Sequence, residues 1–64
     1  MVKVTLKDGS IREYPVNTTL IEIARDISDG LARLALAGEV NGDLVDIRTP
    51  VKEDIRLNFL TFDD

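Results

Sequence analysis

The stretch that decides the fold is Thr19–Ser28, which reads Thr-Leu-Ile-Glu-Ile-Ala-Arg-Asp-Ile-Ser. Its apolar residues recur at the spacing that puts them on one face of an α-helix: Leu20, Ile23, Ala24 and Ile27. Thr19 is the expected N-cap, with its hydroxyl accepting a backbone amide while Glu22 reaches back to the cap amide. Gly30 is expected to end the helix in the left-handed conformation. No other segment predicts a helix of this length, so any sheet must bury its apolar face against this one.

Composition restricts the functional classes that the chain can belong to. Its 64 residues allow one domain, and 44% hydrophobic with 31% charged residues is typical of a soluble globular domain. The sequence has no cysteine and no histidine, which excludes disulfides, thiolate nucleophiles and the commonest general base. We therefore expect no catalytic, cofactor-binding or metal-binding residue. No apolar run or leader predicts a membrane segment, so the cytoplasm is the expected location.

The charge distribution argues against tight binding to nucleic acid. Eight lysines and arginines face twelve acidic residues, which gives a net charge of −4, and the basic residues are isolated from one another along the chain. Proteins bind nucleic acid mainly through clustered cations that displace phosphate counterions. The sequence therefore predicts weak or no direct RNA binding, and no membrane partner.

The segment before the helix predicts a hairpin. Val2–Lys7 alternates apolar and polar residues, as a half-buried strand does, and Asp8-Gly9-Ser10 is a strong turn signal. The strand that returns should run to Pro15, with Tyr14 and Val16 on one face. Because proline cannot donate to a strand ladder, this strand is expected at an edge of the sheet.

The segment after the helix predicts a second hairpin. Asp29–Arg33 reads as a turn with at most a short helical twist, and Leu34–Val40 reads as a strand. Asn41-Gly42 suits a tight turn, because both residues tolerate positive φ, and Asp43–Asp46 is the returning strand.

The remaining residues predict a loop and a final strand. Pro50 places residues 48–54 outside any central strand, so they are expected to form a loop. Residues 55–62 alternate, with Ile55, Leu57 and Phe59 facing inward.

This order of elements predicts an α+β fold. One main helix can cover one face of a single small sheet, which gives a two-layer roll. If the first and last strands lie side by side at the centre, the two hairpins fall outside them. That arrangement is the β-grasp, or ubiquitin-like, roll: a mixed sheet of two hairpins plus a C-terminal strand, with the helix across it.

Ordered segments through most of the chain also carry a resemblance to a known family: Val4-Thr5-Leu6, Asp8-Gly9-Ser10, Ile23–Ile27, Gly30-Leu31-Ala32 and Ala37–Asp46. The chain resembles the TGS domain, a β-grasp module shared by threonyl-tRNA synthetases, certain GTPases and (p)ppGpp enzymes. It is most similar to the N-terminal domain of bacterial threonyl-tRNA synthetases. The GTPases and (p)ppGpp enzymes tend to carry a histidine where this sequence has Ser28.

The resemblance implies that residues 1–64 are a single accessory or regulatory domain, excised from the N-terminus of a longer enzyme. That parent would ligate threonine to its tRNA using ATP, with its zinc, ATP and magnesium sites beyond Asp64. The implied partners are the editing domain and, through the parent, threonine tRNA, in a parent that forms a homodimer. The alternatives are the TGS domain of a GTPase or (p)ppGpp synthetase/hydrolase, and a free-standing ubiquitin-like interaction module.

Three residues are candidates for an interaction surface. Gly38 lies inside a predicted strand, where glycine indicates a bulge or a close backbone approach. Phe62 is out of phase with the inward residues of the last strand, and Ile21 lies off the centre of the helical stripe. Asp26 and Asp29 near the helix end could suggest acid–base or metal chemistry, but surface carboxylates are the commoner explanation.

Overall fold

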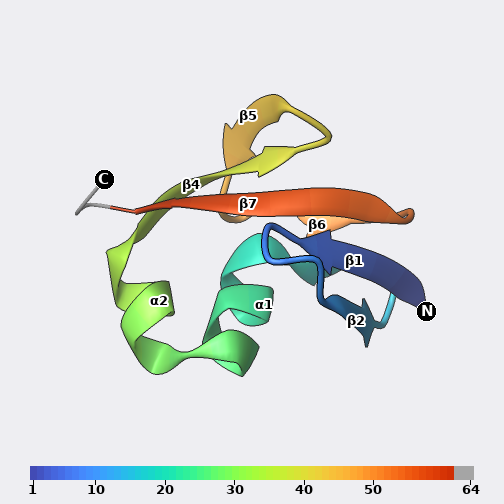
Figure 1. The fold of residues 1–64 in the computed structure, drawn as a ribbon, viewed down its shortest axis with the longest axis horizontal. Helices are drawn as coiled ribbons and strands as arrows, with labels where there is room; N and C mark the ends of the chain where they lie inside the picture. The colour runs from blue at the N-terminus through green and yellow to red at the C-terminus, as the bar shows by residue number, and fades with distance from the viewer. Residues whose placement is uncertain (62–64) are drawn as a thin grey trace.

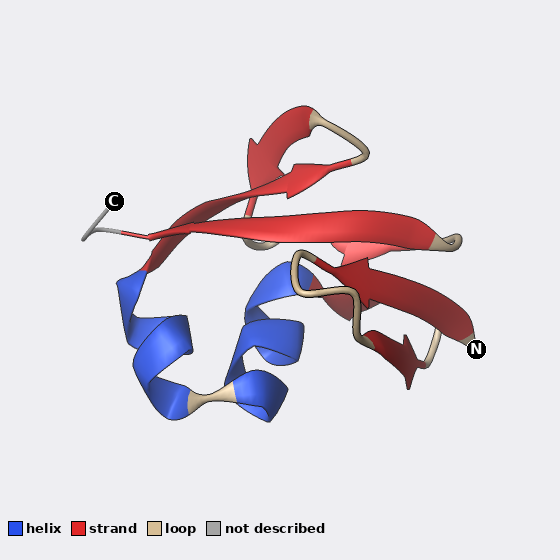
Figure 2. Cartoon of the chain, viewed as in Figure 1, coloured by secondary structure: helices blue, strands red, loops and turns tan. Residues whose placement is uncertain are grey.

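The computed structural model describes residues 1–61 of the chain. Its elements are β1 Val2–Leu6, β2 Ile11–Tyr14, β3 Thr18–Thr19, α1 Leu20–Ile27, α2 Asp29–Leu34, β4 Ala35–Val40, β5 Asp43–Asp46, β6 Pro50–Val51 and β7 Ile55–Thr61. Five strands form one sheet in the order β2-β1-β7-β4-β5 (Figure 1). Strands β3 and β6 pair separately as a two-stranded sheet. Both helices lie on the same side of the larger sheet (Figure 2).

The first and last strands lie side by side at the centre of the sheet. β1 and β7 run parallel, with Val4 opposite Ile55, and the other three pairings in the larger sheet are antiparallel. The hairpins β1–β2 and β4–β5 extend the sheet outward from this central pair. The predicted β-grasp is therefore confirmed, with β2 at an edge as Pro15 requires.

The core forms where α1 crosses the sheet. Leu20, Ile23 and Ala24 are fully buried, and Ile27 is partly buried and packs against the same cluster. From the sheet side the buried members are Val2, Val4, Tyr14, Val51, Ile55 and Leu57. The apolar stripe predicted from the helical spacing is thus the stripe that the sheet covers.

The end of the first helix differs from the prediction. Gly30 does not end α1 in a left-handed conformation, because it lies inside a second helix, α2. Ser28 makes the break instead: its extended backbone (φ −168°, ψ 134°) ends α1, and its hydroxyl accepts the amide of Leu31 at 3.4 Å to cap α2. The second helix continues through Leu34, so the following strand begins one residue later than predicted, at Ala35.

The start of α1 also differs in its hydrogen bonding. Thr19 is the N-cap by backbone conformation, but its hydroxyl donates to Glu22 Oε1 at 2.9 Å and accepts no amide. The amides of Leu20 and Ile21 already donate to carbonyls of residues 47–49, at 3.2 and 2.8 Å. The first two amides of α1 therefore donate to the backbone of a distant segment. Side-chain capping is not needed for these two donors.

One loop prediction and one strand prediction need correction, and one turn prediction is confirmed. Residues 48–54 contain β6, which pairs with β3, although Pro50 stays out of the central sheet as expected. Val16 does not share the buried face of Tyr14, because β2 ends before Pro15 and Val16 is 51% exposed. The Asn41-Gly42 turn has positive φ at both residues, 52° and 88°, as predicted.

Gly38 lies where α1 comes closest to the sheet. A Cβ atom at this position would be 2.7 Å from Leu20 Cδ1 and 3.4 Å from Leu57 Cδ1. Both leucines are buried, so neither has free space into which to move. Glycine at this point of β4 therefore sets the distance between the two layers.

A hydrogen-bonded clamp joins β2 to α1. Tyr14 donates its hydroxyl to Asp26 Oδ2 at 2.9 Å, and Arg12 Nη1 donates to the same oxygen at 3.1 Å. Burial, followed by the hydrogen bond to Asp26, raises the pKa of Tyr14 above its ordinary value of 10.0. Because the side chains of Arg12 and Asp26 are 43% and 55% exposed, their ion pair contributes only about 0–1 kcal/mol.

Replacing Gly38 should destabilise the domain, whereas replacing Gly30 should not. Gly38→Ala forces the buried Leu20 side chain to move, at a cost of about 1–3 kcal/mol. Gly30→Ala puts a Cβ at 3.5 Å from Ser28 Oγ on an exposed helix, where alanine is preferred over glycine by about 1 kcal/mol. Chemical denaturation of the two variants measures both effects, and equal stability of the two would contradict the close-approach role of Gly38.

The clamp predicts an alkaline titration of the single tyrosine. Since the folded-state pKa is raised, the stabilisation is complete below pH 10.0 and is lost as the pH rises through the folded-state pKa. Asp26→Ala should lower the pKa of Tyr14 towards 10.0 without reaching it, because burial remains. Asp29→Ala is the matched control and should change nothing. Ultraviolet titration reads Tyr14 alone, and a wild-type pKa at or below 10.0 would disprove the clamp.

Candidate functional site: the open face of the sheet

The two faces of the sheet have different surroundings. Side chains of a strand alternate between faces, so the residues between the core positions point away from the helices. No helix in residues 1–61 covers this second face (Figure 2). We refer to it as the open face, and it has a polar part, which spans β1, β7 and Glu39 of β4, and an apolar part, which spans β4, β5 and Leu60 of β7.

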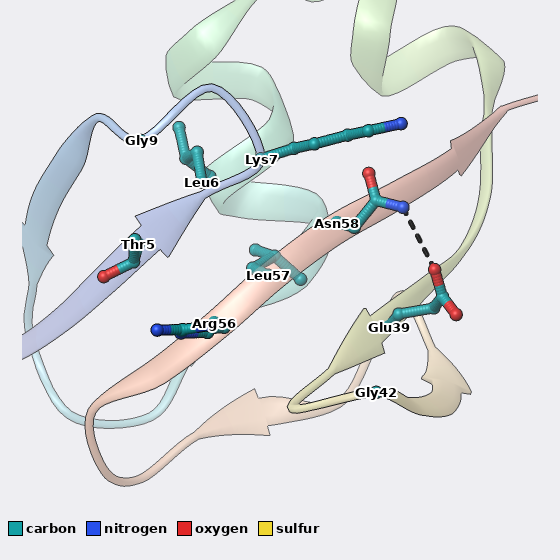
Figure 3. A pocket seen from close by; sticks show the side chains of 9 residues that line it. All are labelled: Thr5, Leu6, Lys7, Gly9, Glu39, Gly42, Arg56, Leu57 and Asn58. Atoms are coloured by element: carbon teal, nitrogen blue, oxygen red, sulfur yellow. Dashed lines mark hydrogen bonds between the residues drawn. The ribbon is translucent and has the colours of Figure 1, made fainter.

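The polar part contains a shallow hollow of about 460 Å³ (Figure 3). Strand pairing builds its floor, because Thr5 is opposite Arg56 and Asn58 is opposite Glu39. The two hairpin turns contribute a glycine each to its rim. The full lining is Thr5, Leu6, Lys7, Gly9, Glu39, Gly42, Arg56, Leu57 and Asn58.

The hydrogen bonds in this hollow hold two of its polar groups in place. Asn58 Nδ2 donates to Glu39 Oε1 at 3.0 Å, which links β7 to β4 across the open face (Figure 3). The backbone of Arg56 exchanges two bonds with Asn41, from its amide to Asn41 Oδ1 and from the Asn41 amide to its carbonyl, each 2.9 Å. These contacts fix the β4–β5 turn against β7.

The hollow offers charge and hydrogen bonding and no reactive group. Lys7 and Arg56 make no ion pair with any residue of 1–61, and in Figure 3 Lys7 extends from the end of β1 towards Asn58. Glu39 adds a carboxylate on the opposite side of β7. Ammonium, guanidinium, amide and carboxylate groups in an open hollow suit polar binding, and none of them forms a nucleophile–base pair.

The apolar part of the open face consists of Leu36, Ala37, Leu44 and Leu60, which we call the apolar patch. Ala37 is opposite Leu60 on β7 and adjoins β5, where Leu44 is opposite Glu39. Leu36 and Leu44 are 63% and 67% exposed. Leucines in this phase are not required by the core, because the core uses the other face.

A β-bulge turns Leu36 outward. The register of β4 against β7 shifts between Ala35 and Ala37, so that Leu36 is an extra residue in the ladder. Ala35 is buried and Leu36 is exposed as a result. Without the bulge, strict alternation from Gly38 would turn Leu36 to the helical side.

The structure describes two of the three residues predicted to form an interaction surface, Gly38 and Ile21, and these two lie apart. Gly38 is buried against Leu20, as described above. Ile21 is half-buried, donates its amide to Ile47, and lines a shallow hollow on the helical side with Arg25, Asp29, Ala32 and Arg33. Phe62 lies outside the described residues. Whether any of the three contacts a partner stays a prediction.

Sequence reasoning missed both parts of the open face. Lys7 and Arg56 are 49 positions apart in the numbering and meet only through the parallel pairing of β1 and β7. The outward orientation of Leu44 and Leu60 could have been predicted, because each is next to an inward-facing residue in its strand. The exposure of Leu36 depends on the bulge, which the sequence pattern does not specify.

Asp26 and Asp8 have structural roles, as acceptors of hydrogen bonds from neighbouring residues. Asp26 anchors the clamp, and Asp29 is exposed in the first turn of α2. Asp8 accepts the hydroxyl of Ser10 at 2.7 Å and its amide at 3.0 Å, and these bonds hold the pKa of Asp8 below its ordinary value of 3.8.

Over residues 1–61, no three His, Cys, Asp or Glu side chains gather as a metal site. Neither α1 nor α2 is long and apolar enough to cross a membrane.

Comparison with known proteins places these features in a family. The model of the TGS domain matches residues 2–61. Threonine–tRNA ligase from Desulforamulus reducens is 62% identical over 64 residues, and the enzyme of the same name from Acetivibrio thermocellus is 59% identical over 64. The threonine–tRNA ligase of Petrotoga mobilis is 45% identical over 64 residues. Each match covers 100% of this chain and 10% of the relative. The β-grasp fold and these matches together establish that the chain belongs to the TGS domain family.

Proposed function

We propose that this TGS domain is a non-catalytic accessory module of a threonyl-tRNA synthetase, the enzyme that uses ATP to ligate threonine to its tRNA. One observation carries the proposal: the three threonine–tRNA ligases described above match the whole chain at 45% identity or more. Since the chain spans 10% of each relative, it would be one module of a longer enzyme.

The catalytic groups of such a parent would lie in other parts of its polypeptide. The 64 residues contain no histidine and no cysteine, which are common ligands of a catalytic zinc. Of the two carboxylates that could have suggested acid–base chemistry, Asp26 accepts the clamp hydrogen bonds and Asp29 is exposed in the first turn of α2. The sites for zinc, ATP and magnesium would therefore lie in the rest of the parent, and this domain would bind other domains of the parent.

The partners of the domain are then other domains of the same enzyme, the editing domain among them. Such a parent would act in the cytoplasm as a homodimer and would reach threonine tRNA through its other domains. Direct RNA binding by this domain would be weak, because its net charge is −4. Arg12 and Arg48 are already paired with Asp26 and Asp46.

The coding sequence and an activity assay test this proposal. We expect the natural reading frame to continue past Asp64 and to encode a threonine–tRNA ligase. The full-length protein should catalyse threonine-dependent ATP–pyrophosphate exchange, and the 64-residue chain should show none above a buffer blank. A frame that continues into a GTPase or a (p)ppGpp enzyme, or that stops after Asp64, would replace the synthetase with one of those alternatives.

A titration with tRNA tests the role of charge. The 64-residue chain should bind tRNA no more tightly than about 10⁻⁴ M, the range of non-specific electrostatic contacts, and added salt should abolish the binding. Lys7→Ala and Arg56→Ala would lower any residual affinity, since these two cations lack an ion pair within residues 1–61. Fluorescence anisotropy measures the affinity. Tight binding that persists in salt would show that the domain itself recognises RNA.

A further inference from the structure

We propose that the apolar patch on the open face is the surface against which the rest of the parent polypeptide packs. The inference rests on the proposed function, because it needs a longer parent, and it adds the face that the domain uses. The occupant is a protein surface of apolar side chains surrounded by lysine or arginine. Exposure, position and charge each support this assignment.

Two of the three leucines of the patch are exposed, the third, Leu60, is half-buried, and strand pairing makes the set contiguous. Leu36 and Leu44 leave 63% and 67% of their surfaces in water, although the chain has a core that could bury leucines. Single exposed leucines are ordinary, but contiguous ones mark interaction sites. Strand pairing makes this set contiguous, since Leu60 is opposite Ala37 and Ala37 is a diagonal neighbour of Leu44. The bulge in β4 adds Leu36 beside them.

The patch lies where the described part of the chain ends. Leu60 belongs to the patch, and Thr61, its neighbour in the chain, pairs with Ala35 at the start of β4. Figure 1 shows this end of β7 beside the beginning of β4. A polypeptide that continues from β7 therefore begins next to the patch. In the relatives, nine-tenths of the protein lies outside the matched segment, which provides ample surface to cover it.

Carboxylates border the patch. Glu39 is opposite Leu44, Asp46 is opposite Ala37, and Asp43 is exposed at the turn end of β5. A cationic rim on the partner would complement these groups. A second copy of this chain docked patch to patch would instead bring the carboxylates of the two copies together. An RNA partner is disfavoured for the same electrostatic reason.

Cysteine labelling measures whether the patch is covered. The native sequence has no cysteine, so Leu44→Cys introduces a thiol at the patch and Val16→Cys introduces one at a control position. Leu44 and Val16 are 67% and 51% exposed and lie outside the core, so both variants keep the fold. Each is made in the 64-residue chain and in the full-length protein and treated with N-ethylmaleimide, and peptide mass spectrometry reads the label at that position.

We expect Leu44→Cys to react at least about tenfold more slowly in the full-length protein than in the 64-residue chain, because packing must open before the reagent enters. Leu36→Cys should behave in the same way, and Val16→Cys should react equally in both. Equal rates for Leu44→Cys overturn the inference and leave the proposed function standing. Protection that rises with concentration in the 64-residue chain, or that needs added tRNA, also overturns it. A reading frame that stops after Asp64 overturns the proposed function as well.

Discussion

The close contact between Leu20 and the sheet at Gly38 determines how the two layers of this domain fit together. A Cβ atom added to Gly38 would lie 2.7 Å from Leu20 Cδ1, so only glycine lets the helix come this near. The same contact buries Leu20 completely and brings α1 over Val4 and Leu57. In a chain of 64 residues the core is small, and the layer spacing decides how much of the helical stripe can be covered. The β2–α1 clamp then holds one edge of the sheet to the same helix.

Periodicity and turn chemistry predicted the parts of the fold that depend on local sequence. The stripe of α1, the alternation of β1 and β7, and the Asn41-Gly42 turn each follow from residue spacing or backbone preference. The second helix was predicted only as a turn with a short helical twist, because Gly30 reads as a helix stop, whereas Ser28 both ends one helix and caps the next. The pairing of β3 with β6 was missed because each strand has two residues, too few for a pattern. Short elements of this kind exist only through long-range contacts.

The interaction surface was harder to predict than the fold. A core position can be predicted from periodicity along the sequence. An exposed leucine indicates an interaction site only when its neighbours across the sheet are known. Leu44 and Leu60 could be placed on the outer phase of their strands, yet their proximity depends on the order β7-β4-β5. The exposure of Leu36 depends on a β-bulge, which strict alternation along the strand does not predict. The sequence candidates Gly38 and Ile21 both lie on the helical side: Gly38 is inside the core, and Ile21 is part of α1, where it lines a hollow together with residues of α2. The difference lies in the information each inference needs: local spacing for the core, and full strand register for the surface.

The central position of β7 has a consequence for synthesis of the protein. β7 is the last strand of this sheet to leave the ribosome and lies between β1 and β4, so neither hairpin can join the other before β7 emerges. Val4 must find Ile55 across nearly the whole length of the domain, which is the kind of distant pairing that slows folding. Until then the apolar stripe of α1 has only part of its cover. A chain truncated before residue 55 would therefore have an unfinished sheet and exposed strand edges, a state prone to association with other chains.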